Sequence, residues 1–166
     1  QERAFPQTAQ PLHEGLMTIE STTAERLIEG LIERIAGINP KAERHREHRW
    51  TPSEGNRERG ASLQPRSFVI LLGASEDVDE GLTGAADVET EIVVGIQVDY
   101  RQVRPEHLGT IIVMDRQDLT DRLCDSWHPV ITGMTASKFA GEELDEETHR
   151  ALFTYTVQYM RARTTT

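Results

Sequence analysis

The sequence predicts an α+β fold in which an antiparallel sheet of about four strands has two helices packed on one face, plus long polar arms and loops. Three observations favour this fold class: a long alternating stretch at Glu89–Arg101, an amphipathic stretch at 24–36, and a second alternating stretch near the C-terminus. We expect an extended N-terminal arm over residues 1–20. A single domain is expected over residues 21–166, because a chain of this length can bury one hydrophobic core.

The first helix is predicted over 24–36. The run Thr22-Thr23-Ala24-Glu25 has the spacing of a capping box, in which a Thr hydroxyl and a Glu carboxylate satisfy free N–H groups at the start of a helix. Gly37 and Asn39-Pro40 are typical of a helix end. An apolar stripe at helical spacing predicts that this helix lies across the apolar face of the sheet; it holds Leu27, Ile28, Leu31, Ile32 and Ile35.

Residues 41–66 are predicted to form a long polar connection or a protruding hairpin, and loops of this length are usually functional or disordered. His45, Glu47 and His48 raise the question of a metal site. Their spacing matches neither a zinc ribbon nor the two-histidine helix of metalloproteases, so we expect no metal site but a solvated or partner-facing arm. Trp50 is unusual in such a polar segment, and exposed Trp residues in loops often act as interface anchors.

Two strands follow. Arg66–Gly73 is short and apolar on both faces, which is typical of a central strand covered on both sides. The acidic connection Ala74–Asp87 leads into Glu89–Arg101, and we expect the two strands to pair as an antiparallel hairpin with a long tip. In the second strand one parity is apolar, with Ile92, Val94, Ile96, Val98 and Tyr100, and the other is mostly polar, with Glu91, Val93, Gly95, Gln97 and Asp99.

The segment after Arg101 allows two interpretations. Pro105 can open one helix that runs to Trp127, with a possible break at Gly109. Alternatively, 110–114 is a short strand and Asp115 caps a separate helix over 116–126. We favour the mostly helical interpretation.

The last part of the chain is expected to hold one short and one long strand. Val130-Ile131-Thr132 is consistent with a short strand, and Gly133–Asp145 with a mixed loop. Alternation from Phe153 to Met160 predicts the final strand.

The formal net charge of −10 argues against general nucleic-acid binding, which usually needs a basic footprint. The charge is unevenly distributed. Residues 41–66 hold seven Lys or Arg against four Glu, whereas 76–91 hold seven acidic residues and no basic one. Opposed patches of this kind suit head-to-tail contact between copies or between proteins, although solvated loops have the same composition.

No catalytic motif is recognisable. Cys124 lies in a helical pattern and resembles a core thiol, and the histidines outside 41–66 lack a Ser/His/Asp context. Neither a phosphate-binding Gly-rich loop nor an EF-hand spacing occurs. The sequence therefore predicts a protein that is not an enzyme and needs no cofactor. Its single cysteine excludes an internal disulfide and is typical of a reducing compartment.

The order of these elements resembles the tail terminator family of long-tailed bacteriophages, the neck proteins that cap the head-proximal end of the tail tube. The resemblance covers 22–163 and rests on the helix Ala24–Ile35, the paired strands Ser67–Gly73 and Glu89–Arg101, the helix ending near Trp127, and the last strand Phe153–Arg161. The long strand ends in Val-Asp-Tyr-Arg. Residues 1–20 and 41–66 are longer than the resemblance would lead us to expect.

This resemblance implies a structural virion protein, assembled in the host cytoplasm, that forms a homohexameric ring around the DNA channel. The ring would end tube polymerisation and lie between the tail tube protein and a head-completion or connector protein, and DNA would pass without specific binding. On this basis the residues expected to line the channel or an interface are Glu76, Asp77, Asp79, Glu80, Glu91, Gln97 and Asp99. Those expected in an inter-subunit arm are Arg44, Arg46, Arg49, Trp50, Arg57 and Arg59.

Two alternatives stay open at this point. One is another ring of the phage neck or tail, such as a head-closure or tube protein. The other belongs to a different class: a small cytoplasmic α+β enzyme or ligand-binding domain with a pocket between helix 24–36 and the sheet. A closed oligomer distinguishes the first class, and a cleft with converging polar groups distinguishes the second.

Overall fold

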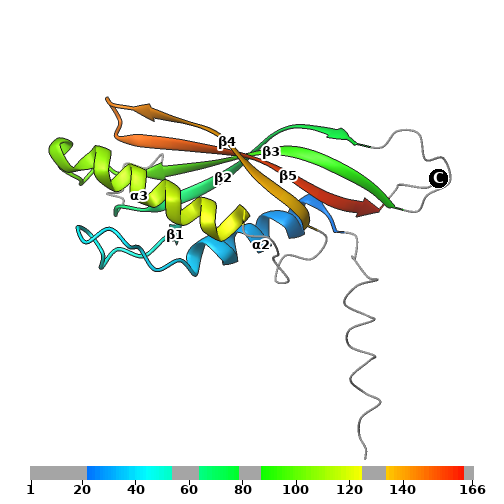
Figure 1. Cartoon of the computed structure of the whole chain (residues 1–166), viewed down its shortest axis with the longest axis horizontal. Coiled ribbons are helices and arrows are strands. Elements are labelled where there is room, and N and C mark those ends of the chain that lie inside the picture. The colour runs from blue at the N-terminus through cyan, green and yellow to red at the C-terminus, as the bar shows by residue number, and fades with distance from the viewer. Residues whose placement is uncertain (1–21, 54–63, 79–86, 125–133, 163–166) are drawn as a thin grey trace, which may run out of the picture.

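The computed structural model describes residues 22–53, 64–78, 87–124 and 134–162 (Figure 1). Within these ranges the chain forms two long helices and five strands. In chain order they are α2 (Ala24–Ala36), β1 (Thr51–Pro52), β2 (Ser67–Asp77), β3 (Asp87–Asp99), α3 (Pro105–Cys124), β4 (Met134–Asp145) and β5 (Arg150–Ala162).

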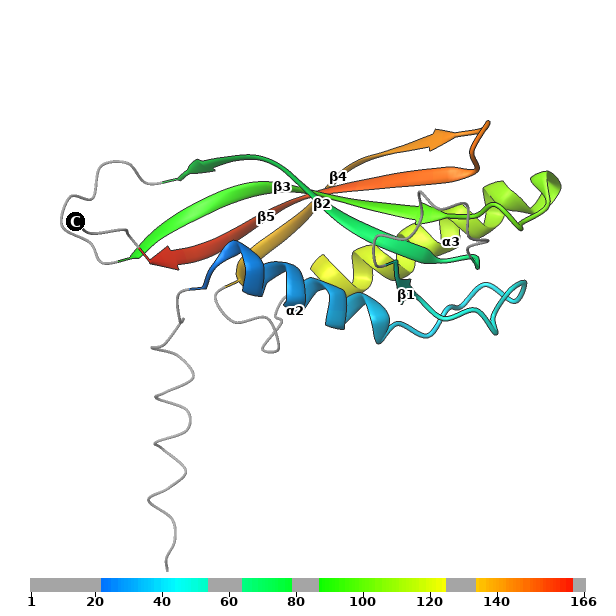
Figure 2. The same ribbon diagram turned by 180° about the vertical axis from the view of Figure 1, so that it is seen from behind.

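The strands form one curled, mixed sheet. Its order is β1-β2-β3-β5-β4, with β1 parallel to β2 and the other neighbours antiparallel. The sheet curves as a half-barrel (Figures 1 and 2). The predicted fold class, an antiparallel sheet of about four strands with two helices on one face, is therefore wrong. The reason is that the 41–66 connection returns to the domain and adds a parallel edge strand, and that a strand also forms where a loop was expected.

The core lies on the concave side of the sheet. Alternate residues of β3 and β5 are buried there, in agreement with the parities read from the sequence. α3 runs along this side and α2 packs beside it (Figures 1 and 2). The fully buried side chains include Leu27, Leu31, Ile35, Ile96, Ile111, Leu119, Phe153 and Tyr155.

The β2–β3 hairpin is confirmed. Phe68 lies opposite Val98, and the antiparallel register continues to the pair Asp77 and Thr90, with one irregularity between Leu72 and Ser75. β2 extends past Gly73, where the predicted strand ended, because β3 continues to provide backbone partners beyond that residue.

Helix α2 is confirmed, but its cap is one residue later than the capping-box spacing implies. The Thr23 hydroxyl accepts a hydrogen bond from the backbone N–H of Arg26 (3.2 Å). Thr22 is buried, and its own N–H donates to the carbonyl of Met160 in β5 (2.7 Å). Thr22 therefore connects the start of α2 to the sheet rather than capping the helix.

The region after β3 decides between the two interpretations given above. α3 is continuous from Pro105 to Cys124 and has no break at Gly109, so the strand at 110–114 does not form.

The prediction of a loop at Gly133–Asp145 is wrong because β4 occupies Met134–Asp145. Two register shifts, near Met134/Ala136 and Phe139/Gly141, interrupt the alternation of β4 and hide it in the sequence. The expected strand at 130–132 lies outside the described residues.

Candidate functional site

A buried ion pair joins the 41–53 segment to the core. The Arg66 and Asp115 side chains are both fully buried, and Arg66 Nε donates to Asp115 Oδ2 (2.8 Å). Tyr100 OH donates to the same carboxylate oxygen (2.7 Å). Burial raises the pKa of Tyr100 well above its ordinary range, so this hydroxyl stays protonated as a donor. Burial also raises the pKa of Asp115, while the bonds from Arg66 and Tyr100 act in the opposite direction.

Another nitrogen of the Arg66 guanidinium, Nη1, holds the turn at residues 45–48. This Nη1 donates to the backbone carbonyls of His45 and His48, the latter at 3.0 Å. Arg66 lies at a positive φ of 68°, and its own carbonyl accepts a bond from the N–H of Thr51 (3.0 Å). The buried Arg66 side chain therefore links the turn at residues 45–48 to α3 through Asp115.

The predicted arm over 41–66 is corrected where the structure describes it. Trp50 was expected to be exposed as an interface anchor, but only 2% of it is accessible, and it packs edge-on against Phe68 (ring centroids 6.1 Å apart). Arg44, Arg46 and Arg49 are exposed. Arg57 and Arg59 lie outside the described residues. The described part of the segment thus turns Trp50 to the core and Arg44, Arg46 and Arg49 to solvent, whereas Arg66 is buried.

The residues predicted to line a channel do not share one surface. Glu76 lies opposite Glu91 across the β2–β3 pair, and both belong to the parity that faces away from the core, as does Gln97. Asp77 is on the opposite face, where Arg161 Nη2 donates to its Oδ2 (2.8 Å). Asp79 and Glu80 lie outside the described residues.

Asp99 is buried and has a structural partner set. Arg101 Nε donates to its Oδ2 at 3.0 Å, and Arg150 Nε lies 3.8 Å from the same oxygen. A carboxylate that is paired in this way is not available to a channel. The outward-facing polar group therefore reduces to Glu76, Glu91 and Gln97 among the residues that the structure describes.

Among the described residues, both edges of the sheet lack a further strand over long stretches. β1 covers β2 only at Ser67 and Phe68, so within the described ranges the rest of β2 pairs with β3 alone. At the other edge, the only described strand that pairs with β4 is β5. An open strand edge presents unpaired N–H and C=O groups that can accept a further strand.

A hollow of about 330 Å³ lies between the C-terminal ends of α2 and α3. Two arginine side chains that line it donate hydrogen bonds to backbone carbonyls at the helix ends. Arg34 Nη2 donates to the carbonyl of Arg122 (2.8 Å), and Arg122 Nε donates to the carbonyl of Arg34 (3.0 Å). Each guanidinium thus satisfies a carbonyl at the end of the other helix, where cations are favourable. This geometry fixes the two helices together.

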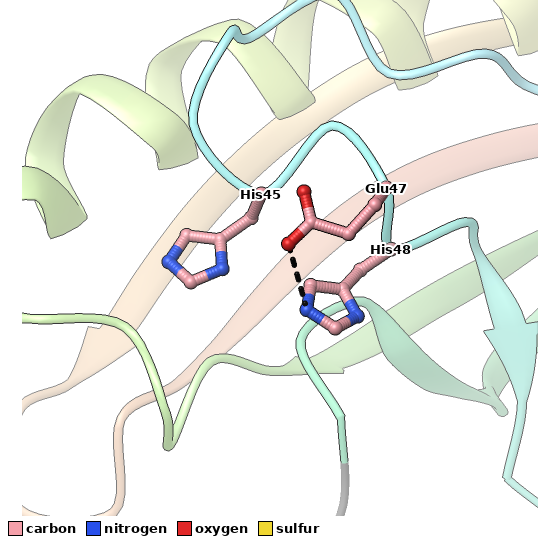
Figure 3. A group of neighbouring side chains, drawn as sticks. All are labelled: His45, Glu47 and His48. Atoms are coloured by element: carbon pink, nitrogen blue, oxygen red, sulfur yellow. Dashed lines mark ion pairs between the residues drawn. The ribbon is translucent and has the colours of Figure 1, made fainter.

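Three potential metal ligands meet in the turn that Arg66 holds. His45, Glu47 and His48 each offer a ligand atom, and these atoms all lie within 4.8 Å of one another (Figure 3). His48 Nε2 is 3.3 Å from Glu47 Oε2. Burial, and then the neighbouring His48, lower the pKa of His45, which favours its neutral ring. The sequence analysis expected no metal site at these three residues, because their spacing matches neither a zinc ribbon nor the two-histidine helix of metalloproteases. It did not predict that their side chains converge.

Arg66, Asp115 and Tyr100 were not predicted as site residues, although the sequence carries a signal for one of them. Asp115 occupies a position on the apolar stripe formed by Ile111, Ile112 and Leu119. An acidic residue on the buried face of a helix requires a buried partner, because an unpaired charge is too costly there. The pattern does not say which cation provides it.

No protein-family model matches the chain, and no curated protein sequence is significantly similar to it. Neither α2 nor α3, the long helices of the described ranges, is both long and apolar enough to cross a membrane.

Proposed function

We propose that this chain is a structural ring protein of a bacteriophage tail, a tail terminator that ends tube polymerisation and joins the tail to head-completion proteins. The observation that carries the proposal is the pair of open edges on one sheet. Among the described residues, the stretch of β2 over 69–76 and the whole of β4 form the two outer edges of the strand order β1-β2-β3-β5-β4. One edge can therefore meet the other edge of a second copy.

Contact between two different edges is head-to-tail, and such contacts close into a ring when the rotation between copies divides a full turn. The curl of the sheet supplies a rotation from one edge to the other (Figures 1 and 2). The register shifts of β4 limit the ways in which it can pair, and this favours one contact over open-ended aggregation. A homohexamer is the ring size that the resemblance implies.

The exposed part of β2 gives this contact an apolar element. From Leu71 to Asp77 most residues of the strand are exposed, and 46% of Leu71 is accessible. A neighbouring copy that covers this stretch would remove apolar area from water, which is the main favourable term in association. Glu76 and Glu91 on the same outward face would give the channel an acidic wall that repels phosphate and lets DNA slide.

The first experiment is the mass of the purified chain by light scattering behind size exclusion, with negative-stain images of the main peak. We expect a ring of about six copies. Leu71→Glu is expected to give monomers, because it places a charge in the contact. Val113→Glu is the matched control, since Val113 is equally apolar and 44% accessible but lies on α3.

Two results would overturn the proposal. One is a wild-type chain that stays monomeric even when mixed with tail tubes of its own phage. The other is a ring that L71E leaves intact.

The acidic wall has a separate test. The double variant E76K/E91K should retain double-stranded DNA in a filter assay at physiological salt, whereas wild type should not. The double variant E29K/E33K, at two exposed positions of α2, carries the same change of charge and is the control. If the double variant and the wild-type ring retain DNA equally, these residues do not face the channel.

A further inference from the structure

The three converging side chains of the 45–48 turn form a site that the proposed ring function does not use. We infer that His45, Glu47 and His48 bind one divalent transition-metal ion, with Zn²⁺ as the representative. Two imidazoles and one carboxylate are ligands that Zn²⁺ takes in sites with three protein ligands, in which a water or another group fills the fourth position.

The distances fit such a site. With metal–ligand bonds of about 2.1 Å, ligand atoms in a tetrahedral zinc site are roughly 3.4 Å apart. The three ligand atoms here lie within 4.8 Å of one another, and His48 Nε2 is already 3.3 Å from Glu47 Oε2. Binding would require side-chain rotations that bring the remaining ligand atoms closer by at most about 1.4 Å. One ring nitrogen of His45 faces the Glu47 carboxylate (Figure 3).

The backbone of the turn is already held in the shape that brings the ligands together. His45 lies at a φ of 59°, a region that His adopts more readily than most residues. Its carbonyl accepts a bond from the N–H of His48 (3.1 Å). The Arg66 side chain donates hydrogen bonds to the backbone carbonyls of His45 and His48, and Asp115 balances the charge of Arg66. A site that is held in this way loses little conformational freedom on binding.

The surroundings of the three side chains contain features that favour a bound metal and charges that oppose it. Nδ1 of His45 is buried and has no hydrogen-bond partner among the described residues, an unfavourable state that a bond to a metal would remove. Arg44, Arg46 and Arg49 repel a cation, but they are exposed, so solvent and salt screen them. Glu47 supplies a negative charge directly at the site.

The experiment is a calorimetric titration of the full chain, without a histidine tag, with Zn²⁺. We expect one ion per chain. Asn is the replacement for His45 because it also tolerates a positive φ. His45→Asn and His48→Gln should each weaken binding by about 100-fold or more. Loss of a residue that only hydrogen-bonds to a metal ligand already lowers metal affinity by about 10–100-fold, and loss of the ligand itself should cost more. Co²⁺ should give the intense visible bands of a four-coordinate ion in wild type and lose them in H48Q.

His149→Asn is the matched control. His149 also lies at a positive φ, 53°, but it is in the β4–β5 turn and outside the cluster. H149N should bind Zn²⁺ as wild type does. The inference is overturned if wild type binds no Zn²⁺, or if H45N and H48Q bind as tightly as wild type. It is equally overturned if H149N loses as much affinity as H45N.

Glu47→Gln keeps the test decisive if a histidine variant fails to fold. It alters an exposed side chain, and it should weaken binding while circular dichroism stays unchanged.

Discussion

Replacing Asp115 by Asn tests the central ion pair of the domain. The amide keeps the shape of the side chain but removes the charge that balances Arg66, whose side chain is fully buried. Removal of one partner from a buried pair costs about 3–5 kcal/mol, because the other charge stays in the interior. Since domains are stable by only about 5–15 kcal/mol, D115N should lower the free energy of unfolding by a large fraction.

The matched control is Glu142→Gln. Glu142 also forms an ion pair with an arginine, with Arg116 Nε 3.0 Å from its Oε1, but both side chains are partly exposed. Solvent screens this pair, so the same carboxylate-to-amide change should cost about 1 kcal/mol or less. The comparison isolates burial, because the chemical change is the same at both positions.

The assay is urea unfolding at pH 7, followed by circular dichroism. A local readout comes from Trp50 in a Trp127→Phe background, where Trp50 is the remaining tryptophan of the two in the chain. D115N should shift its emission to the red, because Arg66 no longer holds the turn next to it. If D115N costs no more than E142Q, the pair does not hold this segment and the argument for the site is refuted.

Three further predictions follow from single contacts. Glu76→Lys should stabilise the isolated chain by up to about 1 kcal/mol, because Glu76 lies directly opposite Glu91; urea unfolding that shows a loss would contradict this. Burial raises the pKa of Cys124, so its thiol should react with a disulfide reagent more slowly than free cysteine at pH 8, with a midpoint at higher pH; faster reaction would refute it. Thr23→Ala should cost about 1 kcal/mol by removing the cap on the Arg26 N–H, measured against Thr23→Ser, which should retain it.

Local periodicity determined much of the sheet and the first helix. The parities of β3 and β5 identified the buried faces correctly, because each side chain in a strand is placed by its own backbone. The same reasoning failed for β4. Its register shifts move residues from one face to the other, so a strand with two bulges has no simple alternation to detect.

The candidate site depended on contacts that no local pattern contains. Asp115 lies on the apolar stripe of α3, but the sequence analysis considered it only as a helix cap, and its partner, Arg66, is 49 residues away in the sequence. Trp50 looked like an exposed anchor because its neighbours are polar, and only the return of the chain to β2 shows that it is buried.

The sequence by itself therefore determined which faces of β3, β5 and α2 are apolar. The tertiary structure decided where the polar side chains of residues 41–53 and of Arg66 lie. The physical reason is that apolar burial follows from the period of one element, whereas a buried charge or a converging set of ligands requires partners that only the folded chain brings together.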